Sequence, residues 1–150
     1  MADDICIFCG QKPGAFQSIS IDCGGVPQNA CKACEKELKD LTELELCQRA
    51  LIRGMAEKPE RIQARIELIN EAENHRPKCL QCGEKLTFTH MQELDNSPMR
   101  NDIFKDSFKI QPALCKACGR YEFYNPITVR KNKHLAYLIK KDTENYISYL

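Results

Sequence analysis

Four pairs of cysteines, each with two residues between its members, constrain this chain more than any other feature of its sequence. They account for eight of its ten cysteines: Cys6 and Cys9, Cys31 and Cys34, Cys79 and Cys82, Cys115 and Cys118. Thiolates at this spacing are typical zinc ligands, and two pairs complete a tetrahedron. The sequence therefore predicts two zinc ions per chain. Because four thiolates leave no open coordination position for water or substrate, we expect both ions to be structural.

Two other uses of the cysteines have to be weighed. Disulfides need an oxidising compartment, but residues 1–20 contain Asp3 and Asp4 and lack the apolar core of a signal peptide. We therefore expect a cytoplasmic protein with reduced cysteines. No segment approaches the roughly 20 apolar residues that span a membrane, so we expect no membrane association. Iron on four thiolates, as in rubredoxin, is the alternative metal, because ligands alone do not identify the ion.

The spacing of the pairs predicts two small modules within the 150 residues. Each module is too short to bury a large hydrophobic core of its own. A structural zinc site contributes an apparent binding free energy of about 10–16 kcal/mol in isolated finger peptides, which exceeds the stability of most domains. We therefore expect the metal to decide whether each module folds.

The first module is predicted at residues 1–48. Gly10 directly follows Cys9, which favours a zinc knuckle, a sharp turn whose backbone amides point at the sulfurs. Residues 16–21 alternate as in a strand, and residues 22–25 form a Gly-rich turn.

The second pair of this module leads into a different element. Glu35–Leu41 is a strong helix former that contains no glycine. We therefore expect Cys31 and Cys34 at the start of a helix, where the helix dipole and the free amides favour thiolates.

Knuckle, hairpin and a cysteine pair that opens a helix make up the treble-clef arrangement. Over residues 4–48, Cys6-Ile7-Phe8-Cys9-Gly10 together with Cys31-Lys32-Ala33-Cys34 and the acidic helix resembles the N-terminal zinc-binding domain of the ClpX unfoldase. That family's domain dimerises and receives adaptors and substrates, so the resemblance implies protein partners and a homodimer. None of the family's ATPase follows here.

A helical connector is predicted at residues 49–76. One helix is expected to run from Cys34 to Gly54, because apolar residues recur there at helical spacing; they are Leu38, Leu41, Leu44, Cys47, Leu51 and, just beyond, Met55. A second helix is expected to begin at Pro59 and to end near residues 74–77. The opposite charges of the connector nearly cancel, which indicates a solvated face.

The second module, a three-stranded zinc ribbon with a C-terminal helix, is predicted at residues 77–150. Each of its cysteine pairs is followed by a glycine, and thirty-two residues from Gly83 to Leu114 separate the pairs. Strands are expected at residues 85–89, 107–110 and 121–124, with a loop or long hairpin at 91–106. Residues 130–150 are expected to form one amphipathic helix that packs on the ribbon.

This module also resembles a known family. Over residues 77–126, Cys79-x2-Cys82-Gly83 followed by a hairpin and by Cys115-Lys116-Ala117-Cys118-Gly119-Arg120-Tyr121-Glu122-Phe123-Tyr124 looks like the small bacterial zinc-ribbon proteins described as nucleic-acid-binding. The resemblance implies zinc, and it implies nucleic acid as a second class of partner.

Aromatic and basic side chains of the second module are the candidate contacts for such a partner. Residues 79–150 contain eleven basic and eight acidic side chains, so only this part of the chain is basic. Aromatic rings beside cations suit the stacking of single-stranded bases, but half of the rings are expected to fill the small core instead. The candidates are Lys85, Phe88, Lys109, Lys116, Arg120, Tyr121, Phe123, Tyr124, Arg130, Lys131 and Lys133, and Phe104 and Phe108 belong to the same aromatic set.

Two cysteines and two histidines remain outside the predicted sites. Cys47 shares a helix face with leucines and is expected to be a small buried thiol. Cys23 lies in the Gly-rich turn, and its position there is compatible with a reactive thiol or with an alternative metal ligand. His75 and His90 lie near the second site, but four thiolates make them unnecessary as ligands.

Taken together, the sequence predicts an α+β protein with two zinc-stapled modules and a helical connector. No arrangement typical of a catalytic site is recognisable, so we expect no enzyme activity. The leading hypothesis is an adaptor or regulator whose zinc modules are protein-interaction surfaces. The second hypothesis is a nucleic-acid-binding zinc-ribbon protein, and the third is a rubredoxin-like or thiol redox protein.

Overall fold

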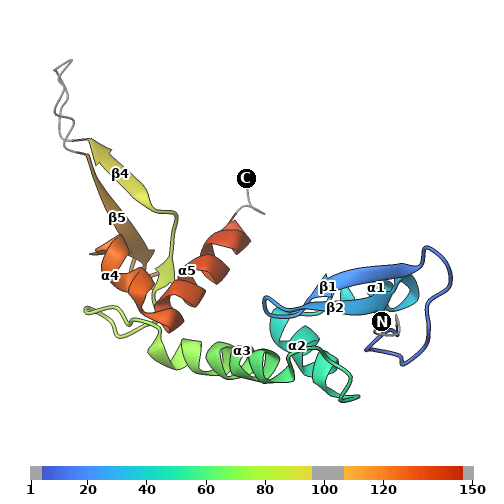
Figure 1. Ribbon diagram of the computed structural model, residues 1–150. Coiled ribbons are helices and arrows are strands. Elements are labelled where there is room, and N and C mark those ends of the chain that lie inside the picture. The colour runs from blue at the N-terminus through green and yellow to red at the C-terminus, as the bar shows by residue number, and fades with distance from the viewer. Residues whose placement is uncertain (1–4, 96–106, 147–150) are drawn as a thin grey trace. The chain divides into compact units, whose positions relative to one another are not determined.

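A computed structural model describes residues 5–95 and 107–146 of the chain. The protein mixes helices and strands and divides into two compact units, Met1–Asn70 and Glu71–Leu150. Figure 1 shows the elements in chain order, and each unit contains one small antiparallel sheet and one set of four neighbouring cysteines.

The first unit is built on a β-hairpin. Strand β1 (Ser18–Asp22) pairs with β2 (Pro27–Cys31) in a register that places Ser18 opposite Cys31. Gly24 and Gly25 both have positive φ in the connecting turn, at 65° and 84°, and this backbone conformation favours glycine. The predicted strand and turn therefore lie close to where the sequence placed them.

Three helices follow the hairpin: α1 (Lys32–Leu38), α2 (Glu43–Leu51) and α3 (Pro59–Ala72). The last two residues of α3 belong to the second unit. The buried core of the first unit draws on the segment before the hairpin, the turn, α2 and α3, and it consists of Ile7, Cys23, Val26, Cys47, Ala50, Ile62 and Ile66.

The single helix expected from Cys34 to Gly54 is wrong, because the chain turns between α1 and α2. Thr42 is the N-cap of α2: its side chain accepts a hydrogen bond from the N–H of Glu45 at 3.3 Å, and the Glu45 carboxylate accepts one from the N–H of Thr42 at 2.8 Å. This reciprocal pair is a capping box, which satisfies two backbone donors at a helix start. The box begins a new helix although the apolar spacing continues across it.

Gln28 ties the hairpin to the loop before α3. Its side chain is buried and donates to the carbonyl of Glu57 at 3.0 Å, while the N–H of Glu57 donates to its Oε1 at 2.9 Å. Both polar ends of the buried amide are thus satisfied, as burial requires.

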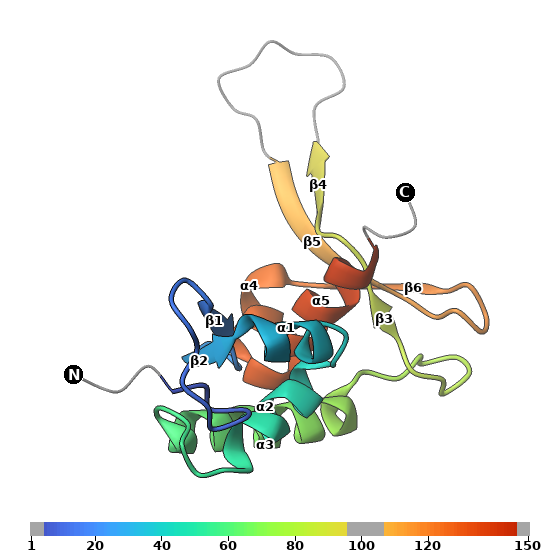
Figure 2. The ribbon, with the colours of Figure 1, turned by 90° about the vertical axis from the view of Figure 1, so that its right-hand side faces the viewer.

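The second unit contains a four-stranded antiparallel sheet instead of the expected three strands. It consists of β3 (Thr87–Phe88), β4 (Gln92–Asp95), β5 (Ser107–Leu114) and β6 (Tyr121–Tyr124). Strand β4 pairs with the first half of β5, and β3 and β6 flank its second half (Figure 2). The expected loop at 91–106 thus begins with a strand, and its remainder, including Phe104, lies outside the described residues.

The helix expected at residues 130–150 is present as α5, but it begins at Lys133, and a separate short helix that was not expected precedes it. Helix α4 (Pro126–Lys131) is capped by Asn125, whose Oδ1 accepts from the N–H groups of Ile127 and Thr128. Helix α5 (Lys133–Tyr146) follows Asn132, whose Oδ1 accepts from the first turn of α5. Asparagine is a strong N-cap residue, and here it restarts the helix. Ile147 and Leu150 lie outside the described residues.

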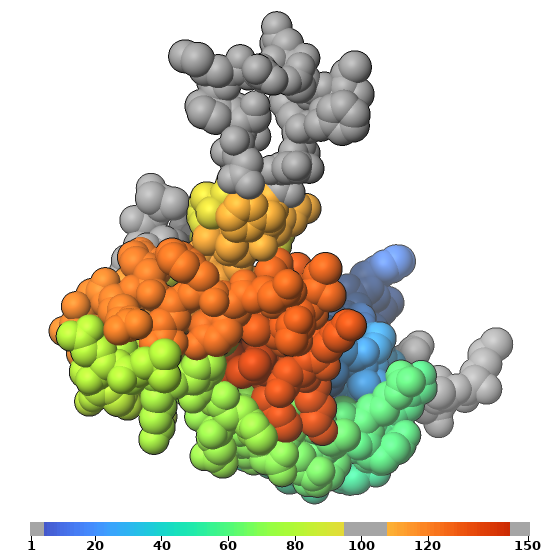
Figure 3. Space-filling model, turned by 90° about the vertical axis from the view of Figure 1, so that its left-hand side faces the viewer, coloured from blue at the N-terminus to red at the C-terminus, as the bar shows by residue number. Residues whose placement is uncertain are grey.

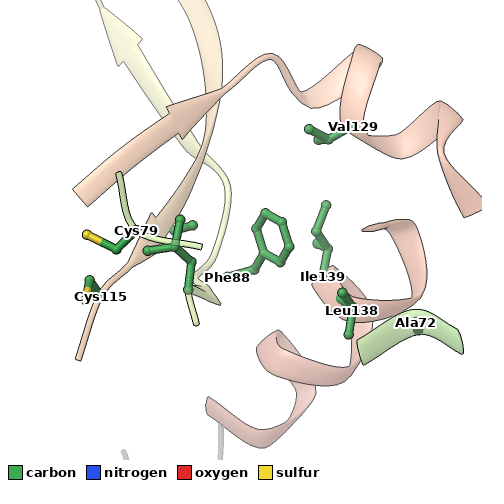
Figure 4. Packing of buried hydrophobic residues seen from close by; sticks show 9 residues of the cluster. Ala72, Cys79, Phe88, Cys115, Val129, Leu138 and Ile139 are labelled. Atoms are coloured by element: carbon green, nitrogen blue, oxygen red, sulfur yellow. The ribbon is translucent and has the colours of Figure 1, made fainter. Parts of the chain in front are cut away.

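One face of the sheet packs on α5 and forms the core of the second unit. Phe88 is fully buried, and its ring points toward Ile139 of α5 (Figure 4). It also meets the ring of Tyr124 edge to face, with centroids 6.0 Å apart. The buried members of this core are Ala72, Cys79, Leu86, Phe88, Ala113, Cys115, Val129, Leu138 and Ile139.

Candidate metal centres

The first cluster of thiols combines a turn and a helix start. The N–H of Gly10, whose φ is 74°, donates to the carbonyl of Cys6 at 2.8 Å, and this closes the turn that carries Cys6 and Cys9. Cys31 is the N-cap residue of α1, and Cys34 lies in its first turn. The hairpin β1–β2 brings these two segments together, as the sequence predicted.

The second cluster is made of two turns of the same kind. Gly83 donates to the carbonyl of Cys79 at 2.9 Å, and Gly119 donates to the carbonyl of Cys115 at 2.8 Å. Both glycines have positive φ, 77° and 75°. The turns lie beside β3 and at the end of β5, so the sheet sets the distance between them. Each turn can present two sulfurs to one ion.

The sulfur positions fit a tetrahedral ion. Within each set of four, all Sγ atoms lie within 4.8 Å of one another. Cys6 and Cys34 are 3.8 Å apart and Cys9 and Cys31 are 3.9 Å apart. A regular tetrahedron with zinc–sulfur bonds of about 2.3 Å has edges of about 3.8 Å. The first set matches this value closely.

In the second set the corresponding distances are 3.7 Å between Cys79 and Cys118 and 3.4 Å between Cys82 and Cys115. Four sulfurs at such distances, all of them from free thiols, can close a tetrahedron around one ion. Iron on four thiolates has the same arrangement, so the geometry defines a metal site and not the element.

Backbone hydrogen bonds favour the thiolate form at one ligand of each site, Cys79 and Cys6, whereas burial and hydrogen bonds with neighbouring thiols raise the pKa of Cys9, Cys34, Cys82 and Cys118. Hydrogen bonds from backbone N–H groups, first that of Cys82, lower the pKa of Cys79 to about 7. Burial by itself raises the pKa of Cys6, but three backbone hydrogen bonds, chiefly from Cys9, outweigh it and lower the pKa to about 7. Metal binding releases the thiol protons, so this bias assists it.

Cys23 and Cys47 belong to neither cluster. Both are fully buried in the core of the first unit. Burial, together with the neighbouring Cys47, raises the pKa of Cys23 to about 12, and burial with the nearby Glu43 raises the pKa of Cys47 to about 11. Reactive thiols are exposed and have a low pKa, so these two are packing residues. Cys47 is a small buried thiol, as expected. Burial leaves no support for Cys23 as a reactive thiol or as an alternative metal ligand.

The two histidines near the second site also lie outside the thiol clusters of the described residues. The ring of His75 stacks on that of His134, with centroids 4.0 Å apart and planes 4° apart. His90 lines a hollow on the surface of the sheet. The two sets of four cysteines thus contain all the ligands that each site needs.

The candidate contact residues fall into two groups. Phe88 is buried in the core, so its ring cannot contact a partner at the surface. Tyr124 is half-buried, so only part of its ring is accessible to a partner. The other nine are exposed: Lys85, Lys109, Lys116, Arg120, Tyr121, Phe123, Arg130, Lys131 and Lys133.

The side of the sheet opposite the core carries an exposed apolar surface. Direct cross-strand partners share a face and successive residues alternate, so Leu94, Phe108, Ile110, Tyr121 and Phe123 lie on one side, here named the aromatic face. Leu94 is 42% exposed, Phe108 47%, Tyr121 50% and Phe123 65%. These residues line a hollow of about 710 Å³. The sequence did not indicate Leu94 as part of this surface, because β4 carries only one apolar residue.

Fold and sites together define a class: a protein of mixed helix and sheet with two cysteine sites that fit zinc. The chain matches no protein-family model, and no significant match is found among curated proteins or among solved structures. Within the described residues, no helix combines the length and the apolarity needed to cross a bilayer.

Proposed function

We propose that the protein is a non-catalytic zinc-binding adaptor or regulator that binds partner proteins through surfaces held in shape by two zinc ions. In this proposal the first unit is a treble clef and the second is a zinc ribbon enlarged by β4. The order of knuckle, hairpin and helix-borne cysteines supports the first assignment. The two knuckles at the same end of the sheet support the second.

The observation that carries the proposal is the aromatic face. A sheet that is covered on one side and apolar on the other leaves large side chains in water, and contiguous exposed apolar surfaces mark interaction sites. Tyrosine and phenylalanine are enriched in the centres of protein interfaces. The metal sites have no free coordination position when four sulfurs are bound, so the ions support a surface instead of acting on a substrate.

A pull-down with the metal-loaded chain tests this function. Lysate is treated with nuclease and the retained proteins are quantified for the wild type and for the double variant Tyr121→Ser, Phe123→Ser. Ile52→Ser is the matched control, because Ile52 is 73% exposed but lies outside the second unit. We expect proteins that the wild type and the control retain and the double variant loses. Equal retention by all three would exclude the aromatic face as the interaction surface.

Binding of single-stranded nucleic acid is the second candidate, and one observation favours it. The rings of Tyr121 and Phe123 are nearly parallel, with centroids 6.5 Å apart and planes 10° apart, and the exposed cations Lys116 and Arg120 lie in the knuckle just before them. Exposed rings beside cations bind bases by stacking and phosphates by charge.

Anisotropy of labelled mixed-sequence oligonucleotides tests the second candidate. Binding that weakens steeply with salt is expected if phosphates are contacted, because counterions are released. No binding at low salt would exclude it.

Self-association is a separate part of the proposal. It derives from the resemblance of the first unit to the N-terminal zinc-binding domain of the ClpX unfoldase, which dimerises. Light scattering of the zinc-loaded chain should give the mass of a dimer, twice 17.2 kDa. A monomer at high concentration would remove the dimer and leave the adaptor function intact.

A further inference from the structure

A second hollow in the C-terminal unit differs from the aromatic face in its chemistry. It has a volume of about 470 Å³ and lies between the β4–β5 pair and α4. Figure 3 shows the surface of these segments, with the yellow and light orange atoms of β4 and β5 next to the orange atoms of the segment that contains α4. Its volume is within the range of roughly 300–1,000 Å³ that is usual for ligand pockets.

Three partly exposed apolar side chains converge on this hollow. Met91 is 36% exposed, Phe108 47% and Ile127 69%, and they come from three separate segments of the chain. A single exposed apolar residue is ordinary, but several around one depression indicate a surface that gains free energy when it is covered.

Two cations belong to the lining of this hollow. Lys109 of β5 and Arg130 of α4 both line the hollow, and neither forms an ion pair with a described residue. Among the described residues no acidic side chain lines it; Glu93 is the cross-strand partner of Lys109 but stands outside the lining. The described lining therefore combines apolar side chains with positive charge.

We propose that this hollow docks a segment of a partner protein that presents an apolar side chain next to one or more carboxylates. The proposal rests on the adaptor function and names the partner chemistry of one site. Charge complementarity selects a carboxylate, since Lys109 and Arg130 form no ion pair with any acidic residue that the structure describes. The apolar walls select a side chain of the size of leucine or phenylalanine. Stacked bases suit this hollow less well, because Phe108 is the only aromatic side chain among the described residues that line it.

Selection of random eight-residue peptides displayed on phage, with the zinc-loaded full chain as bait, tests the docking site. Enriched sequences should have aspartate or glutamate within two positions of an apolar residue. One enriched peptide is then synthesised, and its affinity is measured by fluorescence anisotropy. Its site is mapped by changes in the backbone amide NMR signals, which are expected at Phe108, Ile127 and Arg130.

Two matched pairs of variants separate docking in the hollow from general electrostatics. Arg130→Glu should weaken peptide binding at least about tenfold, whereas Lys131→Glu, the same charge change at the exposed neighbour on α4 that does not line the hollow, should leave it within about twofold. Ile127→Ser should weaken binding, and Ile52→Ser in the first unit should not.

Several results would overturn the docking site. They are no enrichment, enrichment of basic or purely apolar peptides, or equal losses in the two charge variants. Displacement of the peptide by a single-stranded oligonucleotide whose binding needs Arg130 would assign the hollow to nucleic acid instead. The adaptor function is tested separately by the pull-down, in which the wild type should retain proteins that the Tyr121 and Phe123 double variant does not.

Discussion

Arg76 and Asp142 form a buried ion pair across 66 residues of sequence, with guanidinium–carboxylate distances of 2.6 Å and 3.0 Å. The side chains are 8% and 9% exposed. Asp142 also accepts a hydrogen bond from the N–H of Phe88 at 2.9 Å, and Arg76 also donates to the carbonyl of Leu86 at 2.9 Å. The pair therefore joins three parts of the second unit: the segment before the knuckle at Cys79, the start of the sheet, and α5.

Replacement of Asp142 by alanine should destabilise the second unit strongly. It removes one of the two carboxylates that pair with the buried Arg76 guanidinium, the other being Glu73 at 2.8 Å, and it leaves the N–H of Phe88 without its acceptor. A buried donor that loses its partner costs about 1–3 kcal/mol, and more where a charged group is involved. All five tyrosines lie after residue 120 and the chain has no tryptophan, so tyrosine fluorescence during urea unfolding reports on this unit alone. Glu144→Ala is the control and should change the stability by less than about 0.5 kcal/mol, because the Glu144 carboxylate is exposed and 3.9 Å from Lys140.

Replacement of Gln28 by alanine should loosen the loop before α3 in the first unit. The change leaves the N–H and the carbonyl of Glu57 without the partners they have in the folded chain. Glu57 is exposed, so water partly replaces these bonds, and the loss is that of a typical protein hydrogen bond, about 0.5–1.5 kcal/mol each. Hydrogen exchange at the Glu57 amide should accelerate accordingly. Gln48→Ala, at an exposed position of α2, should leave this exchange rate unchanged; similar rates in both variants would show that the Gln28 bonds contribute little.

Two adjacent glycines of the hairpin turn should respond differently to alanine. Both have positive φ, but a Cβ on Gly24 would lie 2.5 Å from Cγ of Arg65, whereas one on Gly25 would meet no atom within 4 Å. Gly25→Ala should therefore lower the free energy of unfolding by only about 1–2 kcal/mol, because alanine is strained at positive φ. Gly24→Ala should lower it by a further 1–3 kcal/mol or so, because its Cβ would overpack against α3. The free energies of unfolding of the zinc-loaded variants, followed by circular dichroism, give the comparison.

Each metal site should support only its own unit. Cys82→Ser removes one sulfur of the second set, so the tyrosine signal of the folded second unit should be lost, while Cys9→Ser should leave that signal unchanged and unfold the first unit. Elemental analysis should find two zinc ions in the wild type and one in each variant. Fewer than two ions in the wild type, or a coloured protein with iron–thiolate absorption, would contradict zinc at both sites.

The two packing thiols should resist alkylation in the metal-loaded protein. The pKa of Cys23 is raised to about 12 and that of Cys47 to about 11, both chiefly by burial, from the ordinary 9.0. Because the pKa of each thiol is higher in the folded than in the unfolded protein, the folded state gains its full stabilisation from these thiols at pH values below the unfolded-state pKa. This stabilisation disappears as the pH rises through about 9 to 12. Iodoacetamide at neutral pH should therefore leave both thiols intact, as judged by peptide mass spectrometry. Rapid labelling of Cys23 would show that it is reactive.

Local chemistry made the ligands of both sites predictable. Paired cysteines followed by glycine are a local pattern, and the structure brings all eight predicted ligands together in two sets. The position of Cys31 and Cys34 at a helix start was also readable, because strong helix formers follow them. The breaks at Thr42 and Asn132 had readable signals too, a capping box and an asparagine cap, but continuous apolar spacing outweighed them in the prediction.

Long-range pairing explains what the sequence did not reveal. Strand β4 carries a single apolar residue, and it is a strand because its backbone pairs with β5. Alternation along β5 and β6 likewise does not tell which face of the sheet a helix will cover. The burial of Phe88 and the exposure of Phe123 follow from the packing of α5 on one side, which depends on contacts far apart in the chain.

The division of the sulfurs between the units has a consequence for synthesis on the ribosome. All four ligands of the first site lie between Cys6 and Cys34, and its unit closes by Asn70, before any cysteine of the second site has been translated. The nascent first unit can therefore capture its ion and fold while the later cysteines are still absent. Mispairing of ligands between the two sites is then avoided by the order of translation.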